Sequence, residues 1–506
     1  MKLDRTLNTK RNIVVGEIDK FIDILLPFIV RTMIIHFLAT EYLGLMSLYY
    51  AIVQMLNLAE MGFGMAITFS MYKPIADDDS VKINALLKFY TKVYRVVGII
   101  VLIVGLVIMY FLPHFISGTV PEDANIYLLY LVFLINTVLN YFVYPSAKAL
   151  ITAHHRAELT SKSHIITQII MYIAQMLSVY FARDFYLYAL TIPISTVAYN
   201  LLCARQAKKH FPQYYAEGDL DEEEYGEIKK QVIGLMIRKL ATLSRNAFDS
   251  MFVSAFLGLG INAIYGNYYY VMDAIVMILA VVKTSMLGGV GNSIAVESKE
   301  KNLYDMNVIN FLFMWIGGFC SICLLCLYQP FMKIWVGEEM MLPFGMVVMF
   351  SSYFYILKMG DIRTLYAEAA GIWWQARYLS ILEAVVNLLL NYLLVKCMGL
   401  YGIVLATMIS YIIFNFIGGG IILFKHYFTQ GGLGKYFLTN IKYIVVTGFV
   451  AVITYTVVSL VDFNGIVGLI LKGLICAVVS MLLYLVIYIK TKEFKNAVPL
   501  IKAILR

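Results

Sequence analysis

The chain has 506 residues, of which 61% are hydrophobic and 14% charged, and its formal net charge is +8. A water-soluble domain of this length could not carry so much apolar surface, so the composition excludes one. The basic residues are spread over the connections between apolar stretches, which also excludes a nucleic-acid-binding patch.

Along the chain, about fourteen apolar stretches are each long enough to cross a bilayer, for which a helix needs roughly 20 residues. We predict membrane spans at 14–38, 43–71, 91–112, 126–146, 163–182, 185–205, 233–257, 262–287, 307–328, 342–366, 376–397, 401–424, 441–461 and 466–489. The predicted fold class is therefore an all-α polytopic membrane protein.

The connections between these spans alternate between rich and poor in Lys and Arg, which are retained on the cytoplasmic side of a membrane. About 33 of the 40 basic residues lie on one side, together with both chain ends and the connection that carries Arg363 and Arg377. This distribution predicts that both termini are cytoplasmic. Basic clusters beside apolar helices are also expected to contact anionic membrane lipids.

The longest cytoplasmic connection, near 206–231, is acidic and has six predicted spans before it and eight after it. Residues 36–50 and 255–270 resemble each other: in each, a span ends, a short Gly-containing turn follows and a Tyr-rich span begins. Two parallel bundles with a substrate site between them are a recurrent transporter architecture. We predict two pseudo-symmetric six-helix bundles plus a C-terminal helix pair, with boundaries at 1–205 (first bundle), 206–231 (cytoplasmic linker), 232–430 (second bundle) and 431–506 (two-helix extension and tail).

Charged residues inside the predicted spans are the candidates for function, because each costs a few kcal/mol unless it faces a partner or a watery cavity. Asp23, Pro27 and Arg31 share one helix face, as do Arg238, Arg245 and Asp249. Span 8 adds Asp273 and Lys283. Two interpretations stay open. These residues pair along their own helices, as Arg245 with Asp249 and Lys358 with Asp361 would, or the basic ones line a cavity shared by the two halves.

Several stretches resemble the Wzx-type flippases of bacterial polysaccharide and O-antigen (lipopolysaccharide) repeat units. These flippases belong to the MATE-like multidrug/oligosaccharidyl-lipid/polysaccharide exporter (MOP) superfamily. The resemblance lies in Gly44-Leu-Met-Ser-Leu-Tyr49 with 56–66, and in Glu383-Ala-Val-Val-Asn-Leu-Leu-Leu-Asn391 with 395–403 and 406–410. It implies two bundles forming a V, whose helices 1, 2, 7 and 8 line a cavity that opens to one side at a time. It also implies a location in the bacterial cytoplasmic (inner) membrane.

The substrate implied by this resemblance is an oligosaccharide repeat unit linked to undecaprenyl pyrophosphate. Guanidinium groups bind phosphate oxygens in forked pairs and stay charged. The expected substrate-binding residues are Arg31, Arg238, Arg245, Lys283, Gln54 and Asn57, and the expected ion-coupling carboxylates are Asp23, Asp249 and Asp273. A polysaccharide polymerase is the expected protein partner, and the transporter itself is expected to act as a monomer.

No enzyme signature accompanies these helices. Gly431-Gly-Leu-Gly-Lys435 lacks the spacing of a phosphate-binding loop, and Asp77-Asp78-Asp79 has no nucleotide-binding domain behind it. We therefore predict no catalytic residues, no metal and no cofactor beyond an ion gradient of H⁺ or Na⁺. The alternatives are a MATE-type cation-coupled drug or metabolite antiporter, which would need carboxylates in its cavity, and, less favoured, a membrane polysaccharide polymerase or ligase.

Overall fold

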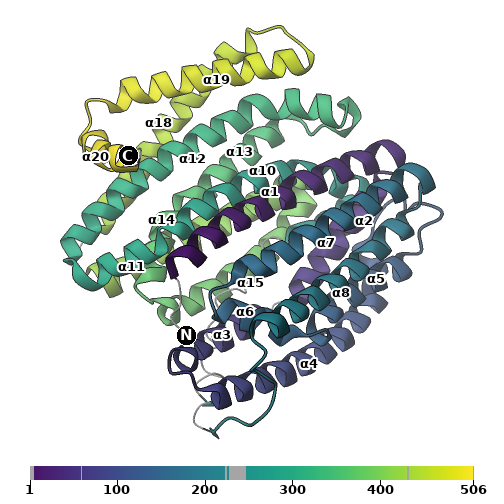
Figure 1. Cartoon of the computed structure of the whole chain (residues 1–506). Helices are drawn as coiled ribbons and strands as arrows, with labels where there is room; N and C mark the ends of the chain where they lie inside the picture. Colours follow the sequence, from purple (N-terminus) through teal and green to yellow (C-terminus); the bar gives the residue numbers. More distant parts are fainter. Residues whose placement is uncertain (1–4, 58–59, 223–224, 227–246, 430–431, 505–506) are drawn as a thin grey trace. The chain divides into compact units, whose positions relative to one another are not determined.

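The structure is a computed structural model that describes residues 5–57, 60–222, 225–226, 247–429 and 432–504. Every regular element in these ranges is a helix, which confirms the all-α prediction (Figure 1). By packing, the chain divides into two compact units, Met1–Ala263 and Ile264–Arg506, and each is described by itself. The predicted bundle boundaries rest on the internal repeat and stay a prediction.

Unit 1 begins with four long or medium helices and ends with a short one. Its elements are α1 (Arg5–Phe37), α2 (Glu41–Leu56), α3 (Glu60–Ala76), α4 (Ser80–Phe111), η2 (Leu112–Phe115), α5 (Ile126–Phe142), α6 (Pro145–Ala153), α7 (Ala157–Leu177), the π-helical η3 (Ser178–Ala182), α8 (Phe185–His210) and a short apolar helix at Ala247–Leu257. The helix α10 (Leu259–Ser285) starts in unit 1 and continues into unit 2.

Unit 2 continues the all-helical architecture. Its elements are α11 (Leu287–Val296), α12 (Lys299–Trp335), η4 (Glu338–Met340), α13 (Phe344–Met359), α14 (Asp361–Ala369), α15 (Trp373–Met398), α16 (Leu400–Ser410), the π-helical η5 (Tyr411–Gly418), α17 (Gly419–Leu423), the π-helical η6 (Phe424–Phe428), α18 (Leu433–Ser459), α19 (Gly465–Tyr488) and α20 (Lys492–Ile504). The long helix α12 packs along α13, α18 and α19 (Figure 1).

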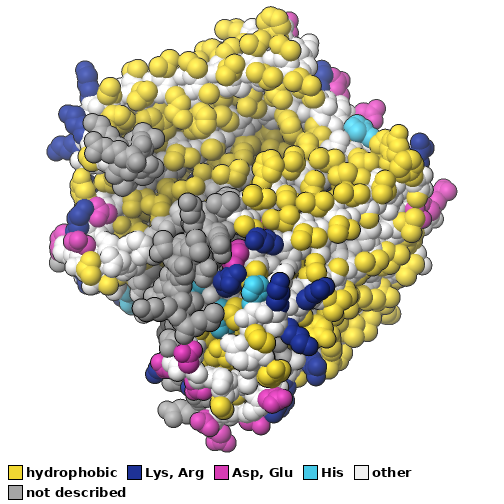
Figure 2. All heavy atoms as spheres, viewed as in Figure 1, with side chains coloured by type: hydrophobic (Ala, Val, Ile, Leu, Met, Phe, Trp, Pro, Cys, Tyr) yellow, Lys and Arg dark blue, Asp and Glu magenta, His cyan; other side chains and the backbone are white. Residues whose placement is uncertain are grey.

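Nine helices of the described ranges are long and apolar enough to cross a membrane, or ten if the bent pair α5 and α6 is one span. They coincide with ten of the predicted spans. Spans 1, 2, 7 and 10 differ: α1 carries several charges, span 7 lies partly outside the described residues, and spans 2 and 10 are each divided between two helices. Hydrophobic side chains cover the lengths of the helices, and charged ones gather mostly near their ends (Figure 2). The chain is a multi-pass membrane protein.

The break between α5 and α6 has a visible cause in the backbone. α5 and α6 meet at 55°, where Tyr144 adopts a left-handed conformation (φ 47°, ψ 51°) directly before Pro145. Proline disfavours the α conformation in the residue before it, so a straight helix cannot pass this point. In span 10, α13 ends at the cap residue Gly360 and α14 starts with Asp361.

Buried tyrosines fill the core of unit 1, and each hydroxyl needs a partner away from water. Tyr49 donates to the carbonyl of Ile126 at 2.9 Å, Tyr130 to that of Gly105 at 3.1 Å, and Tyr141 to Oδ1 of Asn57 at 3.0 Å. Tyr49, which belongs to the predicted second span, is therefore part of this core, whereas Tyr50 beside it is 39% exposed.

The two segments that echo each other in sequence meet inside unit 1. Nδ2 of Asn262 donates to the carbonyl of Gly44 at 3.0 Å. A Cβ atom built on Gly44 would lie 2.2 Å from the carbonyl oxygen of Leu259. Only a residue without a side chain allows this approach, which explains the glycine in the motif at 44–49.

Gly44→Ala is therefore expected to destabilise the folded chain by about 1–3 kcal/mol or more, because the clash is with backbone that cannot rotate away. The matched control is Gly260→Ala, one residue beyond Leu259, where an added Cβ meets no atom within 4 Å. Thermal unfolding of both purified variants in detergent tests this, and equal midpoints would contradict the close approach.

Candidate functional site

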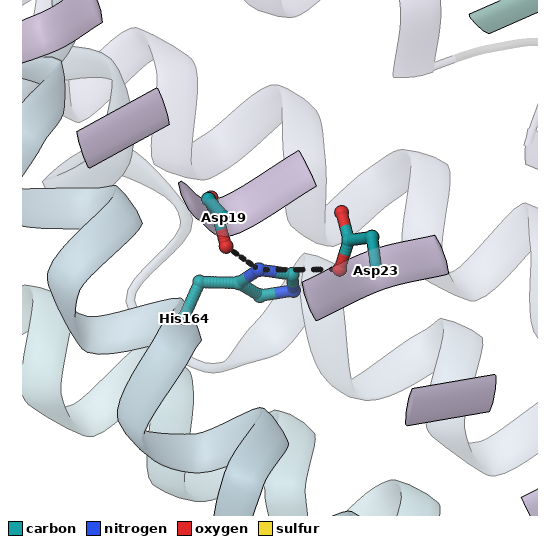
Figure 3. Close-up of side chains that lie close together, drawn as sticks. All are labelled: Asp19, Asp23 and His164. Atoms are coloured by element: carbon teal, nitrogen blue, oxygen red, sulfur yellow. Dashed lines mark hydrogen bonds and ion pairs between the residues drawn. The ribbon is translucent and has the colours of Figure 1, made fainter. Parts of the chain in front are cut away.

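The first polar cluster lies between α1 and α7 in unit 1 and consists of Asp19, Asp23 and His164 (Figure 3). Nδ1 of His164 lies 2.8 Å from Oδ1 of Asp19 and 3.8 Å from Oδ1 of Asp23. The two aspartates are one helical turn apart, so both face the ring. Nζ of Lys20 reaches the other oxygen of Asp23 at 3.3 Å.

Arg31 continues the same face of α1 beyond Asp23 and Pro27. Its side chain is buried, with 8% of the residue exposed, and its Nη2 donates to the carbonyl of Ala263 at 3.5 Å. Burying a guanidinium costs free energy unless it is paired or hydrogen-bonded. We therefore expect Arg31 to serve either in binding a ligand or in holding the fold.

The second cluster lies in unit 2, where α10, α13 and α14 bring two lysines to one carboxylate. Asp361 accepts at 3.3 Å from Nζ of Lys283 through Oδ1, and at 2.8 Å from Nζ of Lys358 through Oδ2. The Lys358 side chain is 4% exposed and the Lys283 side chain 17%. This lysine cluster, Lys283–Asp361–Lys358, carries one positive charge more than its carboxylate neutralises.

Arg363 follows Asp361 of the lysine cluster by two residues on α14. Its Nη2 donates to Oδ1 of Asn415 at 2.7 Å and to Oγ1 of Thr364 at 2.8 Å. A Cβ atom built on Gly419 would lie 2.1 Å from its Nη1. The guanidinium is thus held between α14 and the helical turn around Gly419.

An apolar cavity of about 710 Å³ lies within unit 2, between α12, α13, η5 and α18. Leu325, Ile356, Phe416 and Ile441 are among the side chains that line it. The hydroxyl of Ser321, also in its wall, is bonded to the carbonyl of Ser351 at 2.7 Å. The cavity therefore suits a hydrocarbon chain better than a sugar.

The structure brings some of the predicted site residues together and separates others. Lys283 joins a charged cluster, and Lys358 pairs with Asp361, which confirms that pairing. Asp23 lies beside His164. Arg238 and Arg245 lie outside the described residues. Gln54 is exposed on α2, and Asn57, at the end of α2, accepts from Tyr141.

Two further predicted carboxylates have no ion pair with either cluster among the contacts described above. Asp249 is buried in the short helix at Ala247–Leu257, with 2% exposed. Asp273 lies on α10, close enough to Lys358 for their charges to attract.

Two residues of the first cluster, Asp19 and His164, were missed by sequence reasoning. Asp19 has a visible signal, because it precedes Asp23 by four residues on the same helix face. His164 is a single ionisable group in an apolar span, which is itself a functional signal in a membrane. Arg363, counted among the basic residues of the cytoplasmic side, is only 5% exposed and bonded to Asn415, and its side of the membrane stays a prediction.

The comparisons with solved structures give the class of fold. The fold is similar to that of the lipid II flippase MurJ in an inward closed conformation, at 14% identity and a TM-score of 0.66, over 94% of this chain and 99% of that chain. It is also similar to the inward-facing conformation of a multidrug resistance MATE family transporter of the MOP superfamily, at 13% identity and a TM-score of 0.64, over 80% of this chain and 94% of that chain. Identities this low establish a shared fold and no more.

A third match is a MOP superfamily transporter from Pyrococcus furiosus whose binding pocket is described as having reverse polarity. Its identity is 13% and its TM-score 0.56, over 84% of this chain and 96% of that chain. None of the curated proteins compared with the chain in sequence matches it.

The fold is similar to that of MOP superfamily transporters, and a family profile gives the family. The profile of the polysaccharide biosynthesis proteins matches residues 10–287, more than half of the chain. The chain belongs to this polysaccharide biosynthesis protein family. The predicted resemblance is thereby confirmed for the family and for a fold shared with transporters, and the prediction of a non-enzyme agrees with both.

Proposed function

We propose that the chain flips undecaprenyl-pyrophosphate-linked oligosaccharide repeat units across the bacterial cytoplasmic membrane by alternating access. The flipped repeat units are then assembled into a surface polysaccharide such as O-antigen. Both chain termini lie in the cytoplasm, the transporter acts as a monomer, and a polysaccharide polymerase takes up its product. The family membership of the chain and the chemistry of its buried charged side chains support this proposal.

The observation that carries the proposal is the lysine cluster Lys283–Asp361–Lys358. Lys358, which is buried, and Lys283, which is half-buried, share one carboxylate. These ammonium groups can exchange that partner for a doubly charged diphosphate, because charge-assisted hydrogen bonds to phosphate oxygens are strong. Arg31 offers a forked guanidinium of the same kind. The proposed substrate residues are Lys283 and Arg31, joined by the earlier candidates Arg238, Arg245, Gln54 and Asn57.

The apolar cavity of unit 2 supports the lipid half of the substrate. A polyprenyl chain is all hydrocarbon, and the wall formed by Ile356, Phe416 and Ile441 excludes water from such a chain. In this proposal, the charged head of the substrate binds at the lysine cluster, and its apolar tail lies in the cavity.

Deletion of the chain tests the proposal in cells. We expect completed repeat units to remain on the cytoplasmic leaflet and surface glycan to disappear, while resistance to cationic dyes and drugs stays unchanged. Radiolabelled lipid-linked sugar is extracted from cells with and without treatment by an enzyme that acts only from outside. The fraction that this enzyme can reach is the fraction on the outer leaflet. Repeat units accumulating on the outer leaflet would contradict the flippase and indicate a polymerase.

A cation-coupled antiporter is the second candidate, because Asp19 and Asp23 place two carboxylates side by side in unit 1. Carboxylates attract cations and titrate with protons. Unaltered surface polysaccharide combined with drug hypersensitivity in the deletion strain would favour this antiporter. Under the flippase proposal, an ion gradient of H⁺ or Na⁺ acts on Asp23, Asp249 and Asp273.

A further inference from the structure

The imidazole of His164 on α7 lies beside two carboxylates of α1, so a change in its charge alters the attraction between these two helices. With a neutral ring, the carboxylates of Asp19 and Asp23 face one ammonium group, Lys20, whose side chain is 57% exposed. A protonated ring balances two negative charges with two positive ones. It also converts the 2.8 Å contact with Asp19 into a charge-assisted hydrogen bond.

Gln168 can serve both charge states of this ring. Its side-chain amide nitrogen lies 2.8 Å from Nε2 of His164, so the neutral ring accepts there while Nδ1–H donates to Asp19. When Nε2 gains a proton, the amide turns over and its oxygen accepts from Nε2–H; the two orientations have nearly the same shape. Among the described residues Oε1 of Gln168 has no hydrogen-bond partner, so turning the amide breaks no bond of that oxygen.

The other groups around the ring come from the helices packed against α7. On α8, the ring of Tyr199 meets that of His164 edge to face at 5.3 Å, and Cys203 lies next to Tyr199. On α6, Nζ of Lys148 lies 5.2 Å above the ring of Tyr199. The ionisable neighbours of the imidazole are thus two carboxylates, one nearby ammonium, one phenol and a more distant lysine.

We propose that His164 is the proton-binding residue of unit 1, taking up one proton at Nε2 and releasing it during each transport cycle. The inference rests on the proposed function and names its coupling ion as H⁺. An imidazole is suited to this because its ordinary titration falls near pH 6.5. The side chain is 25% exposed, so it is not sealed inside unit 1. Protonation ties α1 to α7, and deprotonation weakens that tie.

The test is nitrogen-15 NMR of the full chain in lipid nanodiscs, with its seven histidines labelled. The signal that disappears in His164→Asn, or in His164→Gln, belongs to His164. We expect it to change from imidazolium to neutral imidazole between pH 5 and 8, and the pH of this change to differ in Asp19→Asn. A His164 signal that stays in one state over this range, or that responds to added Zn²⁺ and not to pH, overturns the proposal.

Surface glycan measured in cells adds the transport readout. Asparagine keeps a donor near the position of Nδ1 but cannot ionise, so His164→Asn is expected to lose surface glycan at unchanged protein amount. His36→Asn, the same change at the exposed end of α1, is expected to keep it. Normal glycan in His164→Asn overturns the coupling role. If deleting the whole chain leaves glycan unchanged, the flippase proposal fails, whereas the NMR titration still reports the proton site.

Discussion

Asp361→Asn is expected to destabilise the folded chain by about 3–5 kcal/mol, the cost of leaving a buried charge without its partner. Asp361 is the carboxylate that both Lys283 and Lys358 contact, and its side chain is 12% exposed. Asparagine fits the same space but cannot neutralise either ammonium group. The measurement is the thermal unfolding midpoint and folded yield of the purified chain in detergent.

Asp305→Asn provides the matched control for this variant. Nζ of Lys301 contacts Asp305 at 2.6 Å, but this pair is 49% and 30% exposed. Exposed ion pairs contribute about 0–1 kcal/mol because water and salt screen them. A loss in Asp305→Asn as large as that in Asp361→Asn would mean that burial of the lysine cluster does not determine its energetic role.

Lys283→Gln is expected to abolish surface glycan while the amount of protein in the membrane stays at the wild-type level. The fold keeps its neutralised pair, because Lys358 remains 2.8 Å from Asp361. What is lost is the more accessible ammonium group, the one free to exchange its carboxylate for a diphosphate. Surface glycan and membrane protein are measured together in the complemented deletion strain.

Lys301→Gln serves as the control, since it removes a lysine of the same unit that lies on the exposed start of α12. It is expected to leave glycan unchanged. Full glycan in Lys283→Gln at matched protein level would remove Lys283 from the substrate site and leave it a structural residue.

Hydropathy predicted the helices well because burial in a bilayer demands long apolar runs, and every predicted span in the described residues falls on helix. Helix periodicity also placed Asp23 and Arg31 on one face. It does not predict which helices pack together. Lys283 and Asp361 are 78 residues apart, and Asp19 and His164 are 145 apart, so these contacts follow from tertiary packing alone.

The motif at 383–391 is a second case in which the sequence does not predict the packing partner of a polar residue. Asn387 donates to Oγ1 of Thr407 at 3.0 Å and to Oγ of Ser410 at 3.3 Å, and Asn391 donates to Asn387 at 3.4 Å. Asn387 is thus a fully buried link between α15 and α16, and Asn391, also fully buried, is bonded to it on the same helix. From sequence, an amide that joins two helices cannot be told from one that faces a substrate.

The wide π-helical turns of η5 make this segment sensitive to the deletion of a single residue. Asn415, the acceptor for Arg363, lies within Tyr411–Gly418, and a π-helical turn holds more residues than an α-helical one. Deleting one apolar residue there would let the segment tighten and swing Asn415 around the axis, away from the guanidinium. Hydropathy would barely change, yet the register would be lost. Single-codon deletions in this stretch should therefore be far more damaging than conservative substitutions at the same positions.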